Sequence, residues 1–429
     1  MREMKESGIA WIGAMPRAWK MNTIAQIFLQ VKCKNTGLQE KNLLSLSYGK
    51  VKRKSIDTVE GLLPESFDGY NIIEKDDIVL RLTDLQNDHT SLRVGLAEER
   101  GIITSAYLTI RNRSNFCPKY LYYYLHSFDI AKGFYGMGAG VRQGLNWDGV
   151  KWLKILAPSV PEQERIAAFL DAECAEIDTV LEKTRASIEE YKKLKQAVIT
   201  QAVTKGIRGD RPMKDSGIEW IGEIPAGVPI SRVGLHFDIV LGKMLCSAPV
   251  DDNYTLESYY CAADVHFEGL SNGEKKKMWF SPDEKEQYCV KSGDLLVVEG
   301  GAGAGGCAIA ASTDVPIYIQ NSIMIVRSKG ISNIRYLRYL LECLVKKGYI
   351  DVVCNKATIP HFTKDKLANV PFIVFSQSEQ EEIAEYLNEK CAGIDALIAK
   401  KQQYLTEIET YKKSLIYEYV TGKKEVHPL

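Results

Sequence analysis

The stretch whose residue types most suggest chemistry is a glycine-rich run at 297–306, which reads VVEGGAGAGG. A glycine-rich turn after a strand can cradle a nucleotide or S-adenosylmethionine. No Lys-Ser or Lys-Thr follows this run, so it is not a P-loop. No two prolines are adjacent, whereas an adenine methyltransferase would be expected to carry a Pro-Pro-aromatic catalytic tetrapeptide. We therefore interpret the run as a loop that needs backbone freedom or a close approach to DNA.

The histidines and cysteines offer no other route to catalysis. The six histidines show neither metal-ligand spacing nor an HExxH motif, and the ten cysteines form no CxxC pair. No Ser/His/Asp arrangement can be argued from spacing. The sequence therefore predicts no catalytic residue, no metal site and no cofactor bound by this chain.

Basic side chains gather in short clusters that are candidates for DNA contact. Arginine commonly reads guanine, Asn and Gln read adenine, and lysine mostly binds phosphate. The first half offers Lys50, Lys52, Arg53, Lys54, Arg81, Arg93, Arg142 and Gln143. The second half offers Lys275, Lys276, Lys277, Arg335, Arg338, Lys356, His361, Lys364 and Lys366. The alternative for each is a solvated surface charge. The net charge of zero argues against a loose, purely electrostatic polyanion binder.

Some of these candidates have a favourable local context. Arg142 and Gln143 lie in the run 133–144, GFYGMGAGVRQG, whose mobile backbone would suit a loop that enters a DNA groove. His361 lies in the polar stretch KATIPHFTKDK. The tyrosines at 120 and 122–124 cover several faces of an expected helix, so we interpret them as packing residues.

Two long helices must position these loops. The first is predicted at 159–206, where Ser159 and Glu162 form a capping box and Gly206 ends the helix. The second begins at 376, repeats the capping box and ends at a glycine near the end of the chain.

Both helices carry a heptad seam, with apolar residues alternately three and four positions apart, which is typical of a coiled coil. Adding 217 to a seam position of the first helix gives one in the second. The apolar seam includes Leu170, Ile177, Leu181, Ile188, Val198, Leu387, Ile394, Ile398, Leu405 and Leu415. Thr184, Lys195, Lys401 and Lys412 interrupt it. The three lysines either fix the register or extend their polar ends to the edge of the helix pair, and we favour a mixture.

The chain is an internal duplication. Residues 4–20 match 213–229, with Ser-Gly-Ile, Trp-Ile-Gly and Pro shared at an offset of 209. Strands expected at 77–81 and 106–111 and a helix from 118 have counterparts at 293–298, 322–327 and 334–340. The middles, 34–74 and 245–291, do not align. One scaffold carrying two specificities would produce this pattern.

The doubled order of variable region, PEQERIA helix, variable region and SEQEEIA helix resembles the specificity subunit of type I restriction-modification systems. The resemblance implies two DNA target-recognition domains, each reading one half of a split sequence. It also implies antiparallel spacer helices that dock two methyltransferase subunits, which would carry S-adenosylmethionine. In that family a further restriction or translocase subunit supplies the nuclease and motor activity.

The fold class we expect is α+β, with two similar α/β target-recognition domains separated by two long antiparallel coiled-coil helices, as a pseudo-two-fold internal repeat. The expected division is 1–158 and 207–375 for the recognition domains, with 159–206 and 376–429 for the helices. Two helices related by a two-fold axis would suit a duplex with the same symmetry, and the unlike halves need not read a palindrome.

Two other functions stay open at this stage. One is a self-contained DNA methyltransferase with an appended recognition domain, and the other is a coiled-coil adaptor that binds only protein. No apolar run approaches a membrane span, and the first residues lack a signal-peptide core. With the unpaired cysteine pattern, this predicts a cytoplasmic protein with no membrane partner.

Overall fold

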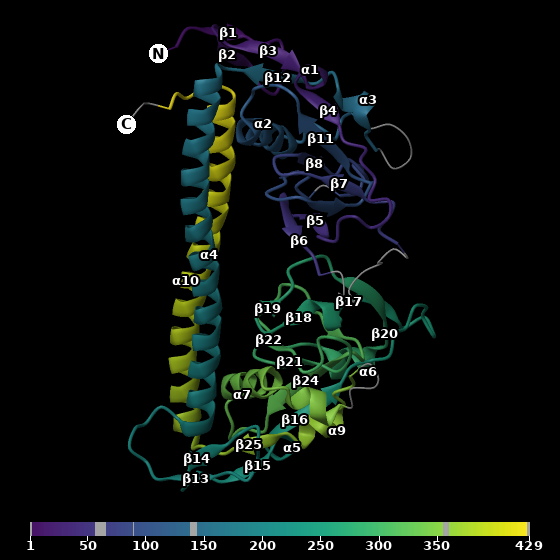
Figure 1. The fold of residues 1–429 in the computed structure, drawn as a ribbon. Coiled ribbons are helices and arrows are strands. Elements are labelled where there is room, and N and C mark those ends of the chain that lie inside the picture. Colours follow the sequence, from purple (N-terminus) through teal and green to yellow (C-terminus); the bar gives the residue numbers. More distant parts are fainter. Residues whose placement is uncertain (1, 56–65, 89, 138–143, 355–359, 427–429) are drawn as a thin grey trace. The chain divides into compact units, whose positions relative to one another are not determined.

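The computed structural model describes residues 2–55, 66–88, 90–137, 144–354 and 360–426 (Figure 1). The chain forms two compact units. Unit 1 comprises residues 1–185 and 403–429, and unit 2 comprises residues 186–402. Both units contain helices and strands, which confirms the expected mixed fold. The units do not end where the long helices begin, because each long helix contributes one part to each unit.

The elements of unit 1 precede the first long helix in the chain. They are β1 (Met4–Glu6), β2 (Ala14–Pro16), β3 (Lys20–Thr23), α1 (Ile24–Ile27), β4 (Phe28–Gln30), β5 (Leu44–Ser47), β6 (Lys50–Arg53), β7 (Asn71–Ile73), β8 (Ile78–Leu80), β9 (Val94–Leu96), β10 (Gly101–Ile103), β11 (Leu108–Asn112), α2 (Pro118–Ile130), α3 (Trp147–Val150) and β12 (Lys154–Ala157).

In the sequence, the strands and short helices of unit 2 come after the long helix α4 (Val160–Lys205) and before the long helix α10 (Gln377–Val420). They are β13 (Met213–Asp215), β14 (Glu223–Pro225), β15 (Ile230–Arg232), α5 (Val233–His236), β16 (Phe237–Leu241), β17 (Thr255–Tyr260), a 3₁₀ turn η1 (Ala262–Asp264), β18 (Val265–His266), β19 (Gly269–Leu270), β20 (Lys276–Phe280), α6 (Pro282–Tyr288), β21 (Leu295–Val298), β22 (Cys307–Ile309), β23 (Tyr318–Ile319), β24 (Ile323–Ser328), α7 (Ile334–Lys346), α8 (Tyr349–Val353), α9 (Lys364–Ala368) and β25 (Pro371–Ile373).

The two units repeat one topology. Each has an antiparallel four-stranded sheet, in the order β4-β11-β8-β9 in unit 1 and β16-β24-β21-β22 in unit 2. Each opens with a short hairpin, and each pairs an early strand with the strand before a long helix, β3 with β12 and β15 with β25. The expected strands and tyrosine helices are therefore confirmed, and their order repeats.

A buried carboxylate pairs with an arginine on the neighbouring strand in both sheets. Asp77 accepts two hydrogen bonds of 2.7 Å from Arg111 in unit 1, and Asp294 accepts bonds of 2.8 and 2.7 Å from Arg327 in unit 2. Each carboxylate also caps its own turn, because Asp77 accepts from the backbone N–H of Glu74 and Asp294 from that of Lys291. The pair joins a turn to the central strand of its sheet.

The long helices pair antiparallel within each unit. In unit 1, Asp178 pairs with Lys412 and Arg185 with Glu409, so positions fall on α10 as they rise on α4. Every apolar seam residue is buried or half-buried. This agrees with the two-helix arrangement expected from the heptads.

The polar interruptions of the seam divide into different roles. Lys412 donates to Asp178 at 2.6 Å in unit 1, and Lys195 binds Asp395 at 2.7 and 2.8 Å in unit 2. These two pairs occupy matching positions of the repeat, since 178 + 217 = 395 and 195 + 217 = 412. Lys401 lies over the ring of Tyr191, 5.7 Å from its centroid, and Thr184 donates to the carbonyl of Val180 in its own helix.

A fully buried tyrosine joins each sheet domain to a helix end. The hydroxyl of Tyr120 lies 3.0 Å from the carbonyl oxygen of Leu156 and 3.3 Å from that of Val420. Tyr336 repeats this with Ile373 at 3.2 Å and Val203 at 3.0 Å. Burial raises the pKa of both hydroxyls well above its usual value, so they stay protonated donors. The interpretation of the tyrosines as packing residues is confirmed for Tyr120.

The glutamates of the predicted capping boxes make a second kind of contact. Ser376 accepts from the backbone N–H of Glu379, as a capping box requires. The carboxylate of Glu379, however, binds Arg211, and the matching Glu162 binds Arg2 at 2.6 Å. These glutamates therefore tie the first residues of each half to the start of a long helix.

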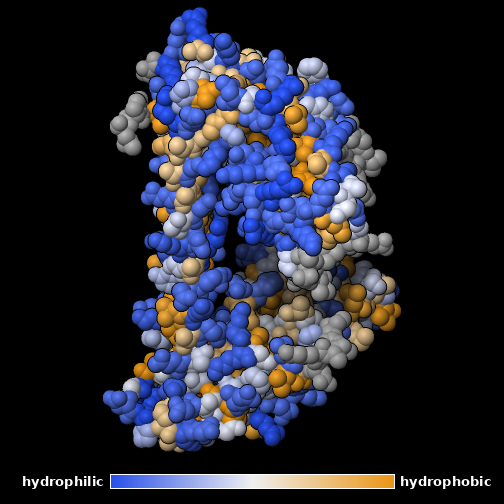
Figure 2. Space-filling model, in the orientation of Figure 1, coloured by the Kyte–Doolittle hydropathy of each residue, from blue (hydrophilic) through white to orange (hydrophobic). Residues whose placement is uncertain are grey.

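Hydrophilic side chains cover much of the surface seen in Figure 2, with hydrophobic ones scattered among them. Of the helices in the described ranges, none is both long enough and apolar enough to cross a membrane.

Candidate nucleic-acid interface

In each unit, the loop at the end of one sheet hairpin lies against the segment that leads back to a long helix. In unit 1 the β8–β9 loop contacts this segment where the N–H of Leu145 donates to the carbonyl of Leu82 at 2.8 Å. In unit 2 the N–H of Phe362 donates to Glu299 at 2.6 Å, at the matching positions of the repeat. We call these places corner 1 (residues 81–88, 90–93, 133–137 and 144–145) and corner 2 (residues 299–306 and 360–362).

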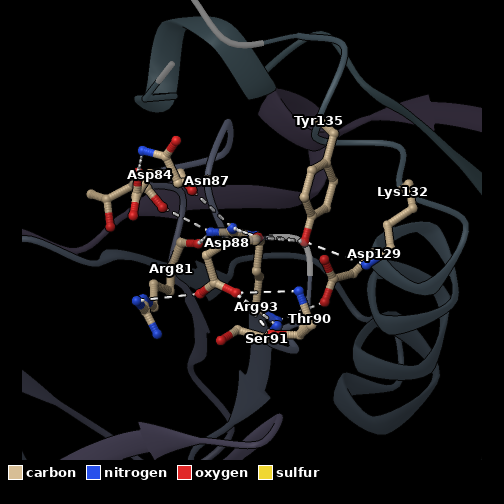
Figure 3. Close-up of polar contacts among 11 residues, drawn as sticks. Arg81, Asp84, Asn87, Asp88, Thr90, Ser91, Arg93, Asp129, Lys132 and Tyr135 are labelled. Atoms are coloured by element: carbon tan, nitrogen blue, oxygen red, sulfur yellow. Dashed lines mark hydrogen bonds and ion pairs between the residues drawn. The ribbon is translucent and has the colours of Figure 1, made fainter. Parts of the chain in front are cut away.

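Corner 1 is built around Arg93, whose side chain is fully buried (Figure 3). Its guanidinium donates to four carbonyl oxygens and to one hydroxyl. The acceptors are Arg81 at 3.0 Å, Thr83 at 2.8 Å, Asp84 at 3.3 Å, Asp88 at 2.5 Å and the Tyr135 hydroxyl at 3.2 Å. The prediction that Arg93 contacts DNA is therefore wrong for this conformation, because the guanidinium is enclosed by its own loop.

Two carboxylates complete this network. Asp129 accepts from the backbone N–H of Arg93 at 2.6 Å, and burial raises the pKa of Asp129 to about 6. Asp88 accepts from the backbone N–H groups of Thr90 and Ser91, and the hydrogen bonds from Ser91 lower the pKa of Asp88 well below its usual value. A deprotonated Asp88 lies 3.5 Å from the guanidinium of Arg81.

The outward side of the loop presents neutral polar groups. Leu85 is buried and fixes the middle of the loop to the core, whereas Thr83, Gln86, Asn87 and Thr90 are the exposed side chains among the loop residues that the structure describes. Arg81 is one-third exposed. Donors and acceptors without net charge are suited to the edges of bases.

The loop of corner 2 is shaped by glycine conformations and close packing instead of a buried arginine. Gly301 and Gly305 have φ values of 86° and 80°, which favour glycine. A Cβ on Gly305 would lie 2.9 Å from Val345 and Ile350. The N–H of Gly305 donates to Val298 at 2.9 Å. The loop interpretation of the glycine run is therefore supported by close packing and a tight backbone turn.

His361 lies beside this glycine loop. Its Nδ1 is 3.3 Å from a carboxylate oxygen of Glu299, its side chain is 60% exposed, and Lys366 donates to its carbonyl at 2.7 Å. Corner 2 thus places His361 beside the glycine run. Lys364 and Lys366 follow on the first turn of α9, where Lys364 is exposed.

The basic cluster 50–54 lies elsewhere, on the β5–β6 hairpin of unit 1. Lys50, Lys52 and Lys54 are exposed, Lys50 lies 3.7 Å from Asp178, and Arg53 pairs with Glu99. The tip of this hairpin is Tyr48, which is 86% exposed. Tyr48 was not a candidate from the sequence, although Gly49 between two short alternating stretches is a sequence signal for a hairpin turn.

The second basic cluster separates into structural and exposed members. Lys275 donates to the carbonyls of Ser271 at 2.6 Å and Gly273 at 3.0 Å and pairs with Asp264, so it holds its own loop. The ammonium of Lys275 is thus bound by its own loop, whereas Lys276 and Lys277 are exposed on β20, and DNA contact by all three stays a prediction.

The remaining candidates fall in two places. Arg335 is exposed on α7, and Arg338 on the same helix donates to Phe267 and pairs with Glu342 at 2.9 Å. Arg142, Gln143 and Lys356 lie outside the described residues. The structure thus brings some predicted residues together at the corners and distributes the others over hairpins and helices.

Each unit also has a cleft between its sheet domain and its part of the helix pair. The cleft of unit 1 is about 320 Å³ and includes His126, Asp178 and Lys412, whereas that of unit 2 is about 1110 Å³ and includes Glu342 and Asp395. Burial, with Lys412 nearby, lowers the pKa of His126 to about 4. Burial raises the pKa of Glu342, although Arg338 opposes this.

The part of the chain that the structure describes contains no group of three or more His, Cys, Asp or Glu side chains that could hold a metal ion.

The comparisons with known proteins address both sequence and fold. The family "Type I restriction modification DNA specificity domain" matches residues 268–407. No curated protein matches the chain. Similar in fold is a chain solved in a study of complex assembly and conformational transition of the type I R-M system, with 17% identity and a TM-score of 0.72 over 96% of this chain and 99% of that one.

A second similar structure is the HsdS subunit from Thermoanaerobacter tengcongensis, with 17% identity and a TM-score of 0.54, covering 98% of this chain and 100% of that one. The chain therefore has the fold of these type I restriction-modification proteins. The DNA specificity domain model of those systems matches residues 268–407 of this chain, which is about a third of its length.

Proposed function

We propose that the chain is the DNA sequence-recognition subunit of a type I restriction-modification complex. Each unit would read one half of a bipartite duplex target, and α4 and α10 would set the spacing and dock methyltransferase subunits. The observation that carries this proposal is the repetition of one scaffold with unlike corners. A reader of two different half-sites needs the same support twice and different groups facing the bases.

The family match and the fold support a recognition subunit over the alternative of a self-contained methyltransferase. The run at 299–306, which was the strongest candidate for a cofactor loop, packs against residues 360–362 and the hydrophobic side chains of Val345 and Ile350. In this proposal S-adenosylmethionine binds to the partner methyltransferase, and this chain contributes no catalytic residue.

The partners in this proposal follow from the complex type. They are double-stranded DNA, two methyltransferase subunits and, in a full restriction complex, restriction or translocase subunits. The complex would work in the cytoplasm, where it meets the DNA.

The test is a methylation assay with S-adenosylmethionine and plasmid DNA, using the purified chain alone and together with its cognate methyltransferase subunit. We expect no methylation by the chain alone and methylation of one split sequence by the mixture. Robust turnover by the chain alone would favour the methyltransferase alternative. Failure to bind duplex DNA in the assembly would favour the protein-only adaptor.

A further inference from the structure

We propose that Arg93 is a positioning residue for base recognition, and that the loop it holds reads adenine in one half-site through the amides of Gln86 and Asn87. This inference rests on the proposed function and names the reading groups of unit 1. None of these amides was a candidate from the sequence.

The first step of the argument is the fixed backbone of the loop. One enclosed guanidinium binds the carbonyls of four loop residues, from Arg81 to Asp88. The Tyr135 ring lies against that guanidinium, 5.0 Å from centroid to Cζ, and the Tyr135 hydroxyl lies 3.1 Å from the carbonyl of Asp88. A loop fixed from inside can present its outer side chains in one geometry, which hydrogen-bonded base readout requires.

The second step is the chemistry of the outer side chains. Asn and Gln can pair with adenine in the major groove, because an amide offers one acceptor for N6–H and one donor for N7. Gln86 and Asn87 are both exposed and adjacent. Unlike the lysines of β6 and β20, they carry no charge that would bind phosphate without regard to sequence.

The third step is the orientation of the Asn87 amide. Its Nδ2 donates to Oδ1 of Asp84 at 2.8 Å. A carboxylate only accepts, so this contact determines which end of the amide is the nitrogen. The Oδ1 atom and one N–H of Asn87 then remain, an acceptor and a donor of the kinds that adenine pairs with. Asp84 is itself placed by Arg93, which binds its carbonyl.

Corner 2 offers a matched contrast within the same molecule. At the corresponding place it presents a glycine run and His361 instead of a pair of amides. Changes in the Arg93 loop should therefore affect one half-site and leave the other unchanged.

The experiment uses the full chain co-expressed with its cognate methyltransferase and maps methylated sequences by long-read sequencing. Gln86→Ala and Asn87→Ala should each lower the preference for adenine at one position of one half-site by about 10-fold, at an unchanged melting temperature. Asn115→Ala, an exposed asparagine in the β11–α2 turn, is the matched control and should change nothing.

Arg93→Met should weaken the adenine preference at the positions that the Gln86 and Asn87 variants affect, and it should also lower the melting temperature. Arg111→Met is its control, because it leaves buried Asp77 unpaired and lowers stability away from the corner. If both arginine variants only reduce total methylation and keep the base preferences, Arg93 has a purely structural role and the inference is overturned.

The outcomes separate this inference from the function on which it rests. A wild-type complex that methylates no split sequence overturns both. A wild-type complex with a clear split sequence, combined with unchanged preferences in the Gln86 and Asn87 variants, overturns only the inference.

Discussion

The two units share the contacts that hold each sheet domain to the long helices, which we call the supports, and they differ at their corners. The tyrosine contacts, the Asp–Arg pairs and the cross-helix lysines recur at matching positions, and the two tyrosines donate to carbonyl oxygens at equivalent positions. Corner 1, in contrast, is fixed by a buried arginine, and corner 2 is formed by glycines in left-handed conformations. Duplication has therefore preserved the groups that attach a domain to the helices and has left the outer loops to diverge.

The largest effect should come from the tyrosine contacts. Tyr120→Ala and Tyr336→Ala each remove a fully buried aromatic side chain and should each cost about 3–5 kcal/mol of unfolding free energy in their own unit. Tyr→Phe at the same positions removes only the hydroxyl and should cost about 1 kcal/mol. Hydrogen–deuterium exchange followed separately in the two units measures this. Equal loosening of both units by either single variant would show that they are not independently supported.

Acid should affect the two clefts in opposite directions. The pKa of His126 is about 4 in the folded state, below the unfolded value of 6.5, so its protonation favours unfolding as pH falls below 6.5. The contribution should be a loss of about 1–2 kcal/mol in unit 1 at pH 5. His126→Gln should remove this loss.

The matching residue of unit 2, Glu342, has a raised pKa, so the folded state takes up its proton first as pH falls. Its contribution to stability should therefore improve on acidification, and Glu342→Gln should abolish that improvement. Urea unfolding of each variant against wild type at pH 7 and pH 5 gives both differences. The same sign at both positions would contradict the account.

The smallest effects should come from the cross-helix lysines. Lys195 and Lys412 are partly exposed and pair with aspartates that are about half exposed, so Lys→Met at either position should cost only about 0.2–1 kcal/mol. The two costs should agree, since the pairs occupy equivalent positions. Thermal melting of both single variants at low and high salt checks this, and a large difference between them would break the symmetry.

The sequence predicted the supports well and the corners poorly. Heptad spacing and a constant offset depend on local periodicity, so the helices and their polar seam positions could be found without coordinates. The burial of Arg93 depends on Tyr135, 42 residues away, and that of Lys275 on a turn that closes over it. These tertiary contacts determine whether a basic side chain is exposed to solvent or bonded to its own backbone. The residue type alone does not predict which of the two occurs.

The same limit applies to the ties between the first residues and the helices. Arg2 and Arg211 are related by the offset of 209, and each binds the glutamate of a PEQ or SEQ segment. The internal repeat could have singled out these two arginines, because they occupy matching positions. The glutamates, however, were already explained by the predicted capping boxes, so no partner was sought for them.

The most direct test of the central claim, that each unit reads its own half-site, is a methylation map of a chain with one unit altered. Residues 21–150 would be replaced by the same region of a relative, and the chain would be co-expressed with its methyltransferase. The account predicts that one half of the methylated sequence changes and that the other half is retained. A change in both halves would contradict it.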